Sequence, residues 1–264
     1  MLQSRYGYAL EEKIRKQIMS LMNKQNYSQM IVDYILNQIE EKKLKKGDKL
    51  MTEQEFSDLL GVSRIPLREA LCALRTVGLL EARQGGGSYV TSQCDPHILG
   101  RMMFNYAILE NVSLSQVIDV RVLLEPESAR QAALQGSQRQ KEEILKTAQD
   151  YQHEIEHYDG TEAQNIRISE LDRDLHQLIS KASHNEFLWL ILTITEMSSM
   201  ELNRDNMLAD SNPNADRSRQ TFMEHHLEIA EAIMEGDGDH AYKIMEKHLQ
   251  TIRQFHALGS AQQA

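Results

Sequence analysis

Apolar residues recur every three or four positions along almost the whole chain, which is the period of amphipathic helices. The first helix is expected over residues 9–22, and a second runs from about Ser28 to Glu41. After residue 95 the same period predicts six or seven helices and no strand, over residues 97–109, 114–135, 138–158, 162–182, 186–207, 217–235 and 239–257. The pattern therefore predicts a mainly α fold.

A different arrangement is expected between residues 50 and 80, where two short helices are joined by a tight turn. Thr52 and Glu55 have the spacing of a capping box, which marks the start of the first of these helices. Gly61 ends it, and Ser63 is the expected N-cap of the next. Two helices joined in this way are typical of a helix-turn-helix.

The second of these short helices carries a candidate DNA-binding face. Its leucines at 67, 71 and 74 follow the helical period and must face inward. Arg64 and Arg68, four residues apart, then lie on the outer face near the helix N-terminus, where they can donate to phosphates and guanine edges. A solvated charged face is the simpler alternative for two arginines taken alone.

The next segment reads as a β-hairpin. Residues 79–83 and 88–90 have strand character and flank the flexible run Gly85-Gly86-Gly87. No Gly-Lys-Ser/Thr follows these glycines, so they do not form a nucleotide phosphate loop. A hairpin in this position is the wing of a winged helix.

Charge separates the chain into two parts. Residues 1–92 contain 14 Lys+Arg and 11 Asp+Glu, whereas residues 93–264 contain 15 and 28, and the whole chain has a net charge of −10. Only the N-terminal third is therefore suited to approach a polyanion such as DNA. The composition also disfavours a large β-sandwich or barrel, since 264 residues include only four Pro, 13 Gly and 15 aromatic side chains.

The run GVSRIPLREALCALRTVGLL, with TEQEF before it and GGGSYV after it, closely resembles the winged helix-turn-helix of the GntR family of bacterial transcription regulators. The resemblance covers about 45 residues. It implies that Ser63, Arg64 and Arg68 contact the major groove or its phosphates, and that the tip near Gly85 reaches the minor groove. Gln54 stands where the family often has a DNA-contacting arginine, and Gln84 precedes the wing glycines, so a different operator preference is expected.

One histidine motif suggests an enzyme but has the wrong register. Residues 153–157, His-Glu-Ile-Glu-His, match the H-E-x-x-H pattern of zinc proteases. The apolar stripe of the surrounding helix contains Ile144, Tyr151 and Ile155, and both histidines lie about 200° from it at the helical angle of roughly 100° per residue. His153 and His157 are therefore expected to face water, and no proteolytic site is predicted.

Other histidines are expected to point inward. His226 lies among Phe222, Ile229 and Ile233, and His248 lies among apolar residues of the last helix, whereas His225 is turned about 100° away from the stripe. These positions predict two buried imidazoles on separate helices.

Asp172 and His176 lie at the inner edge of the helix 162–182, four residues apart. With His226 and His248 they form a set of three nitrogens and one oxygen, which suits a divalent metal. Each residue alone would more simply be a hydrogen-bonded polar group of the core. Burying all four without a metal would be costly, so the set favours a metal site.

Arg121 is the other unusual polar residue, because it shares a helix face with Val117, Ile118 and Leu124. A permanent charge there needs an anion. One alternative is an ion pair with Glu125, one turn away, and the other is a bound small carboxylate. If the second holds, Arg121→Ala is expected to weaken effector binding while leaving the metal and DNA affinity largely intact.

These residues also resemble the FadR subfamily of GntR regulators, whose effector part is the FCD domain. The similarity covers most of residues 97–257 and is carried by Asp119 to Glu125, Asp172 to His176, Asn185 and the segment from His226 to His248. It implies that Asp172, His176, His226 and His248 hold zinc, nickel or another divalent ion. It also implies that a small carboxylate completes the coordination beside Arg121. His225 stands where the family often has a polar or acidic residue, but register favours His226.

The sequence thus predicts an N-terminal helical extension over residues 1–26, a winged helix-turn-helix over 27–92 and an all-helical FCD-type domain over 95–259. The expected protein is a homodimeric, ligand-responsive regulator that binds operator DNA and has no catalytic activity. The alternatives are a metal-dependent hydrolase and a regulator whose metal is purely structural. Without an apolar span of about 18 residues or a signal peptide, a cytoplasmic location is expected. Cys72 and Cys94 are interpreted as small apolar residues.

Overall fold

The structure is a computed structural model that describes residues 27–83, 86–92, 95–207 and 215–261. The chain divides into two compact units, and the division falls between Ile98 and Leu99. We call them unit 1 and unit 2. The helix expected over residues 9–22 lies outside the described residues.

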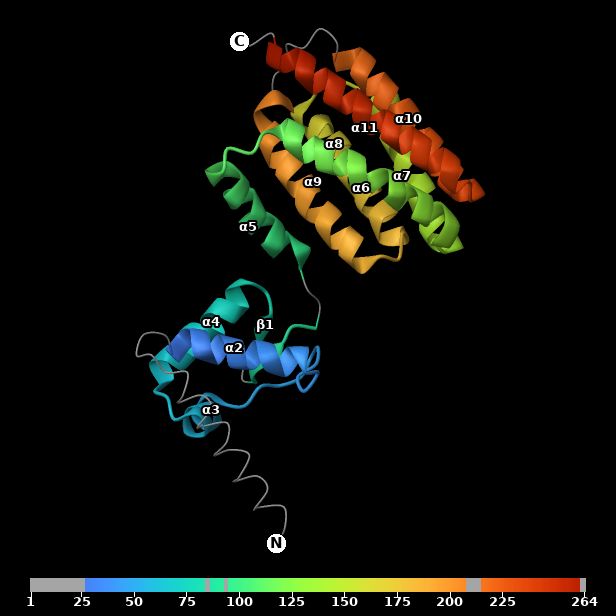
Figure 1. Ribbon diagram of the computed structural model, residues 1–264. Helices are drawn as coiled ribbons and strands as arrows, with labels where there is room; N and C mark the ends of the chain where they lie inside the picture. Colours follow the sequence, from blue (N-terminus) through green and yellow to red (C-terminus); the bar gives the residue numbers. More distant parts are fainter. Residues whose placement is uncertain (1–26, 84–85, 93–94, 208–214, 262–264) are drawn as a thin grey trace. The chain divides into compact units, whose positions relative to one another are not determined.

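Between residues 27 and 92, the described part of unit 1 contains three helices and a two-stranded antiparallel sheet (Figure 1). Its elements are α2 (Tyr27–Glu40), α3 (Glu53–Leu60), α4 (Arg64–Thr76), β1 (Leu80–Arg83) and β2 (Gly87–Val90). Leu80 lies opposite Val90, and Arg83 lies opposite Gly87. The predicted helix-turn-helix and hairpin are therefore both present.

Caps set both ends of the short helix α3. The Glu55 amide donates to Thr52 Oγ1 at 3.2 Å and the Thr52 amide donates to Glu55 Oε2 at 2.8 Å, which completes the predicted capping box. Gly61 ends α3 in the left-handed region with φ 65°, a conformation that glycine adopts without strain. Ser63 occupies the N-cap position of α4, but its side chain makes no capping hydrogen bond.

The core of unit 1 forms where α2, α3 and α4 pack on one another and on the hairpin. Ile31, Ile35, Phe56 and the three predicted leucines of α4 are buried in it. Cys72, which the sequence suggests is a small apolar residue, has an exposed side chain. Its position on α4, one residue after buried Leu71, turns it away from the core stripe.

A short extended segment around Lys49 pairs with strand β2 of the hairpin. This pairing was not predicted from the sequence. Lys49 forms an isolated antiparallel bridge with Tyr89. The Val90 amide donates to Asp48 O and the Leu50 amide donates to Ser88 O, both at 2.9 Å. Two or three extended residues have too little alternation to be recognised from the sequence.

Unit 2 consists of helices throughout the part that the structure describes (Figure 1). They are α5 (Pro96–Leu109), which begins at the end of unit 1, α6 (Leu114–Gln135), α7 (Gln138–Glu156), α8 (Glu162–Ala182), α9 (Glu186–Met207), α10 (Ala215–Glu235) and α11 (Gly238–Ala261). The predicted bounds of α6, α8 and α9 are the observed ones. α7 ends two residues early, so His157 is its C-cap.

α6 is the central helix of unit 2, since it packs against α8, α9, α10 and α11. Small side chains on its inner faces, Ser128, Ala129, Ala132 and Ala133, allow neighbouring helices to approach closely. Ile179, Ile229, Ile233 and Leu249 fill the core around it. This packing brings polar residues of α6, α8, α10 and α11 toward one another inside the unit.

Candidate metal centre and nucleic-acid interface

Three buried histidines from three helices meet inside unit 2. His176 comes from α8, His226 from α10 and His248 from α11, and one ring nitrogen of each lies within 4.8 Å of the other two. Their residues are at most 6% exposed. The apolar stripes of these helices face the core, and the histidines are members of those stripes or border them. The sequence register placed all three correctly.

The separations between the facing atoms suit a single metal ion. His226 Nε2 lies 3.3 Å from His248 Nε2 and 3.4 Å from Asp172 Oδ1. Ligands bound tetrahedrally at about 2.0–2.1 Å from zinc are about 3.4 Å apart. Asp172 is outside the group of three, and its side chain is 40% exposed, so it approaches His226 from the more exposed side of α8. These residues therefore fit a divalent ion.

Burial keeps two of the histidines in the form that binds metals. It lowers the pKa of His226 to about 3 and lowers the pKa of His248 well below its ordinary value. Tyr151 contributes to this burial, since its ring packs edge-on against the His226 ring at a centroid distance of 4.7 Å. Neutral imidazoles offer a lone pair to a metal without competition from a proton.

The third histidine is oriented by a carboxylate. His176 Nδ1 lies 2.6 Å from Glu125 Oε2, while its Nε2 is buried without a hydrogen-bond partner. Burial disfavours the charged form of His176, but the charge and hydrogen bond of Glu125 outweigh it, and the pKa of His176 is raised. Such a partner fixes the tautomer in which Nδ1 carries the proton and Nε2 is available to a metal.

Arg121 and Glu125 form a buried ion pair within α6, in which Arg121 Nε donates to Glu125 Oε1. Although burial raises the pKa of Glu125, the charges of Arg121 and His176 lower it to about 2, so the carboxylate is ionised. The first alternative from the sequence, the ion pair, is therefore present. The guanidinium is not fully used, because Arg121 Nη2 is buried with no partner. A donor thus remains for a second anion.

Glu196 is a further buried acid, and it was not predicted from the sequence. It lies on α9 with Leu192 and Thr193, on the buried face of that helix, and is 5% exposed. Burial raises its pKa to about 8, and His176, Arg121, Glu125 and Asp172 all interact with it electrostatically. The sequence did hold a signal for its burial: Glu196 follows Thr193 by three residues and Leu192 by four, so it shares their helix face.

The remaining histidines agree with the register. His226, rather than His225, belongs to the group of three, although His225 is also buried, with its ring centroid 5.9 Å from that of His248. His153 and His157 are exposed, and their ring centroids lie 4.3 Å apart with the rings tilted by 48°. His157 lies beyond the end of α7, so the H-E-x-x-H motif does not present both imidazoles from one helix.

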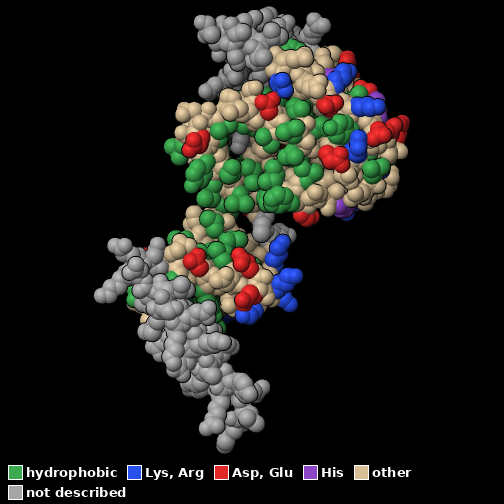
Figure 2. All heavy atoms as spheres, in the orientation of Figure 1, with side chains coloured by type: hydrophobic (Ala, Val, Ile, Leu, Met, Phe, Trp, Pro, Cys, Tyr) green, Lys and Arg blue, Asp and Glu red, His purple; other side chains and the backbone are tan. Residues whose placement is uncertain are grey.

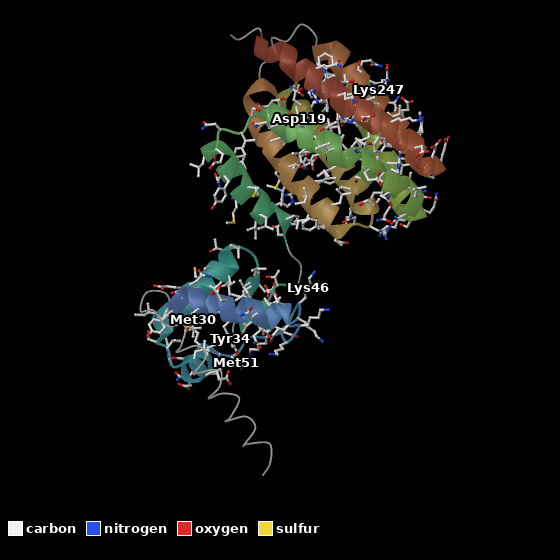
Figure 3. The ribbon with its side chains drawn as sticks, in the orientation of Figure 1. Met30, Tyr34, Lys46, Met51, Asp119 and Lys247 are labelled. Atoms are coloured by element: carbon white, nitrogen blue, oxygen red, sulfur yellow. The ribbon has the colours of Figure 1, made fainter. Side chains whose placement is uncertain are left out.

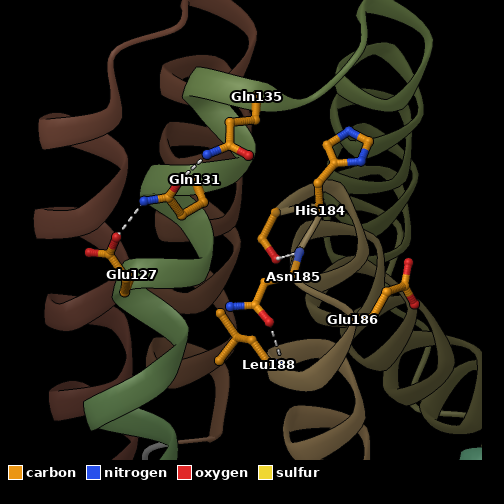
Figure 4. A pocket seen from close by; sticks show the side chains of 8 residues that line it. Glu127, Gln131, Gln135, His184, Asn185, Glu186 and Leu188 are labelled. Atoms are coloured by element: carbon orange, nitrogen blue, oxygen red, sulfur yellow. Dashed lines mark hydrogen bonds between the residues drawn. The ribbon is translucent and has the colours of Figure 1, made fainter. Parts of the chain in front are cut away.

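Asn185 has a capping role at the start of α9. Its Oδ1 accepts from the Leu188 amide at 3.0 Å, and its own amide donates to Ser183 Oγ at 3.3 Å. It lines an open polar pocket with Gln131 and Glu127 of α6 (Figure 4). The histidines of the group of three are not among the residues that line this pocket.

The outer face of α4 presents the predicted DNA-binding residues. Ser63, Arg64 and Arg68 are all exposed. Both arginines contact α3: Arg64 Nη2 donates to Gln54 Oε1, and Arg68 Nε donates to Glu53 Oε2 at 2.8 Å. Gln54 also donates to Asp58 Oδ1 at 2.9 Å. These hydrogen bonds from side chains of α3 therefore orient both arginines.

The hairpin carries positive charge on one face. The Arg83 guanidinium lies 4.2 Å from the centroid of the Tyr89 ring, and Lys49 Nζ lies 5.9 Å from it. Lys46 lies in the turn three residues before Lys49, and Figure 3 labels it. Gln84 and Gly85 lie outside the described residues.

Within the described residues, no helix is long and apolar enough to cross a membrane.

Two family models match the chain. The model of the bacterial regulatory proteins of the gntR family matches residues 27–90, and the FCD domain model matches residues 116–251. Together they include α2 to β2 and most of unit 2.

Individual proteins are similar over most of the chain. The HTH-type transcriptional regulator YcbG of Bacillus subtilis is 26% identical over 88% of this chain and 91% of its own length. The putative L-lactate dehydrogenase operon regulatory protein of Escherichia coli is 28% identical over 85% and 84%. The solved structure of a Streptococcus agalactiae GntR protein is 26% identical, covers 86% of this chain and 99% of that one, and has a TM-score of 0.64. The chain therefore belongs to the GntR family of bacterial transcription regulators, has an FCD domain as its C-terminal part, and is a DNA-binding regulator rather than an enzyme.

Proposed function

We propose that the protein binds a double-stranded operator through α4 and the hairpin, and that unit 2 senses a small carboxylate through a bound metal. The observation that carries this proposal is the convergence of three buried imidazoles beside a buried arginine with a spare donor. A DNA-binding module needs no such centre. The group of imidazoles beside the arginine is instead suited to bind a metal and an anion.

Asp172, His176, His226 and His248 would hold the metal, with zinc as the first candidate and nickel or another divalent ion as alternatives. Arg121 would bind the effector carboxylate through Nη2, the donor that Glu125 leaves unused. The name of one relative refers to an L-lactate dehydrogenase operon, and lactate is a small carboxylate. The alternative of a purely structural metal leaves the free donor of Arg121 without a role.

The test combines metal analysis with operator binding. Purified protein should contain about one divalent ion per chain, measured by mass spectrometry of the metal. An operator selected from random DNA is then titrated at fixed salt, with and without a panel of organic and sugar acids. We expect at least one acid to change the operator affinity by about 5- to 150-fold, the usual range of allosteric coupling. If no acid changes it, the metal is structural.

A homodimer belongs to the same proposal, because one winged helix reads only a few base pairs and a two-fold dimer reads a near-palindromic site. Unit 2 has a candidate interface: hydrophobic side chains gather on one of its faces (Figure 2). The exposed large hydrophobic residues of α5 and of the first half of α6 are Leu99, Met102, Met103, Tyr106, Ile108, Leu109, Val120 and Leu123. Exposed patches of this kind commonly mark protein interfaces.

Light scattering during size-exclusion chromatography tests this interface. The wild-type protein should be a dimer at micromolar concentration, and Leu123→Glu should shift it toward monomer because the patch would then bury a charge. Ile166→Glu on α8, where Ile166 is 54% exposed, is the matched control and should stay dimeric. A monomeric wild type, or a dimeric Leu123→Glu variant, contradicts this part of the proposal.

A further inference from the structure

Glu196 has a buried carboxyl oxygen for which the protein supplies no partner. Oε1 is inaccessible to solvent and makes no hydrogen bond, whereas neighbouring Thr193 donates its hydroxyl proton to Trp189 O at 2.9 Å. A buried polar atom without a partner is costly and rare in folded proteins. An unpaired oxygen here therefore calls for a ligand group.

Two other buried atoms without partners belong to groups that interact with Glu196. They are Arg121 Nη2 on α6 and His176 Nε2 on α8. α9, which carries Glu196, packs against both of these helices, and the charges of Arg121 and His176 both act on the Glu196 carboxyl group. The three atoms offer different chemistry: one donates hydrogen bonds, one is suited to a metal, and one is a carboxyl oxygen.

We propose that Glu196 binds a hydroxyl group on the carbon next to the effector's carboxylate, so that the effector is a 2-hydroxy acid. This inference rests on the proposed function, in which Arg121 and the metal bind the carboxylate. A simple alkanoate would leave the Glu196 oxygen without a partner. A hydroxyl group both donates and accepts, so it satisfies the carboxyl oxygen.

An amino group is the competing donor, but the charges around the site disfavour it. An ammonium ion beside the carboxylate would lie near the Arg121 guanidinium and the divalent ion, both positive. The two carboxylates that could offset this repulsion are already in use, since Glu125 is paired with Arg121 and Asp172 is a proposed metal ligand. A hydroxyl group is neutral and avoids this repulsion. The site is therefore expected to prefer L-lactate to both propionate and L-alanine.

Calorimetry on the full-length, metal-loaded protein tests this preference with matched acids. The pairs are glycolate and acetate, L-lactate and propionate, and L-malate and succinate, with L-alanine as the amino analogue. We expect the wild-type protein to bind at least one hydroxy acid about tenfold or more tightly than its partner. Sites built to pair a hydroxyl group reject analogues that lack it more strongly than apolar pockets do.

Two variants assign the preference to Glu196. Glu196→Leu should bind both members of a pair with similar affinity, and Glu196→Gln should keep part of the preference because its amide can still pair with a hydroxyl group. Thr193→Val is the matched control on the same buried face of α9 and should keep the full preference. Metal content and thermal melting are measured for each variant, and Glu196→Gln carries the test if Glu196→Leu does not fold.

The outcomes separate this inference from the proposed function. Equal affinities for both members of every pair in the wild type would overturn the hydroxy-acid class. A preference that survives in Glu196→Leu would overturn the role of Glu196 while leaving a carboxylate sensor. If the wild type holds its metal but binds no acid at all, the proposed function fails and this inference fails with it.

Ile65 supports a second, independent inference, in unit 1. It is 71% exposed in the first turn of α4, directly after Arg64, although the other apolar side chains of this helix at 67, 71 and 74 are buried. An isoleucine cannot pair with the polar edges of bases, and the 5-methyl group of thymine is the apolar feature of the major groove. We infer that Ile65 contacts a thymine methyl group in each half of the operator.

Replacing thymine by uracil removes that methyl group and nothing else. On the selected operator, one such replacement in each half-site should weaken wild-type binding by about 15-fold, because each of the two lost methyl contacts is worth about fourfold. Ile65→Ala should bind the two operators equally, while Met51→Ala, which removes a half-exposed apolar side chain before α3, should keep the difference. The inference is wrong if no replacement affects the wild type, or if Ile65→Ala remains sensitive.

Discussion

Units 1 and 2 keep their polar groups in opposite environments. In unit 1 the arginines of α4 are exposed, and their partners on α3 are partly exposed side chains of an ordinary surface. In unit 2 His176, His226, His248, Arg121, Glu125 and Glu196 are almost completely buried. A surface that reads DNA can be displayed on one helix, whereas a centre that holds a metal and a small anion must be enclosed by several helices.

Two arginine–carboxylate pairs make this contrast measurable. The Arg121–Glu125 pair has side chains that are each 7% exposed, while in the Arg68–Glu53 pair they are 63% and 38% exposed. Removing one partner of a buried pair leaves an uncompensated charge away from water, but exposed pairs are screened by solvent. The same substitution should therefore have very different consequences in the two units.

The largest effect is expected at the histidines. The double variant His226→Ala/His248→Ala should lose the bound metal completely, because two of the facing nitrogens disappear. Metal analysis should fall from about one ion per chain to none, and added metal should no longer raise the melting temperature. His153→Ala and His157→Ala are the controls and should keep the ion. Metal retained by the double variant would show that other residues bind it.

Arg121→Ala comes next. The sequence led us to expect that this variant would keep its metal, but Glu125 contacts both Arg121 and His176, so removal of the arginine leaves a buried carboxylate beside a candidate ligand. We expect a loss of about 3–5 kcal/mol in the free energy of unfolding, measured with urea. Adding Glu125→Gln should restore part of this loss. No change in stability would mean that Glu125 is not isolated from water.

Arg64→Ala and Arg68→Ala should act on DNA binding and leave unit 2 unaffected. Each should weaken binding to the selected operator by about 1–3 kcal/mol if the side chain contacts a base, and should leave the metal content unchanged. If the side chain contacts a phosphate instead, its removal should weaken binding to all sequences equally and reduce the salt dependence of DNA binding. Unchanged affinity of the double variant would exclude this face of α4.

Glu53→Gln should have the smallest effect. Because the Arg68–Glu53 pair is exposed, the free energy of unfolding should change by less than about 1 kcal/mol. Operator affinity should rise slightly, since Arg68 would no longer have to leave a carboxylate in order to contact DNA. A stability loss as large as that of Arg121→Ala would abolish the contrast between the two pairs.

Much of the fold follows from local sequence rules. The capping box of Thr52 and Glu55 and the glycine at 61 set the limits of α3, and periodicity gave the bounds of α6, α8 and α9 without error. The same register placed His226 and His248 inside and His153 and His157 outside. These features could be predicted because hydrogen bonding and amphipathicity act over one or two helical turns.

Contacts between segments far apart in the chain could be identified only from the tertiary structure. The pairing of Lys49 with Tyr89 joins residues 40 positions apart, and His176 meets Glu125 across 51 positions. Glu196 gave no motif in the sequence, and its importance follows from burial against α6 and α8. The sequence alone determined the apolar stripes that face the core and the histidines 176, 226 and 248 that belong to them or border them, because these depend on helical period. Which of those side chains meet is decided by how the helices pack, and no local pattern records it.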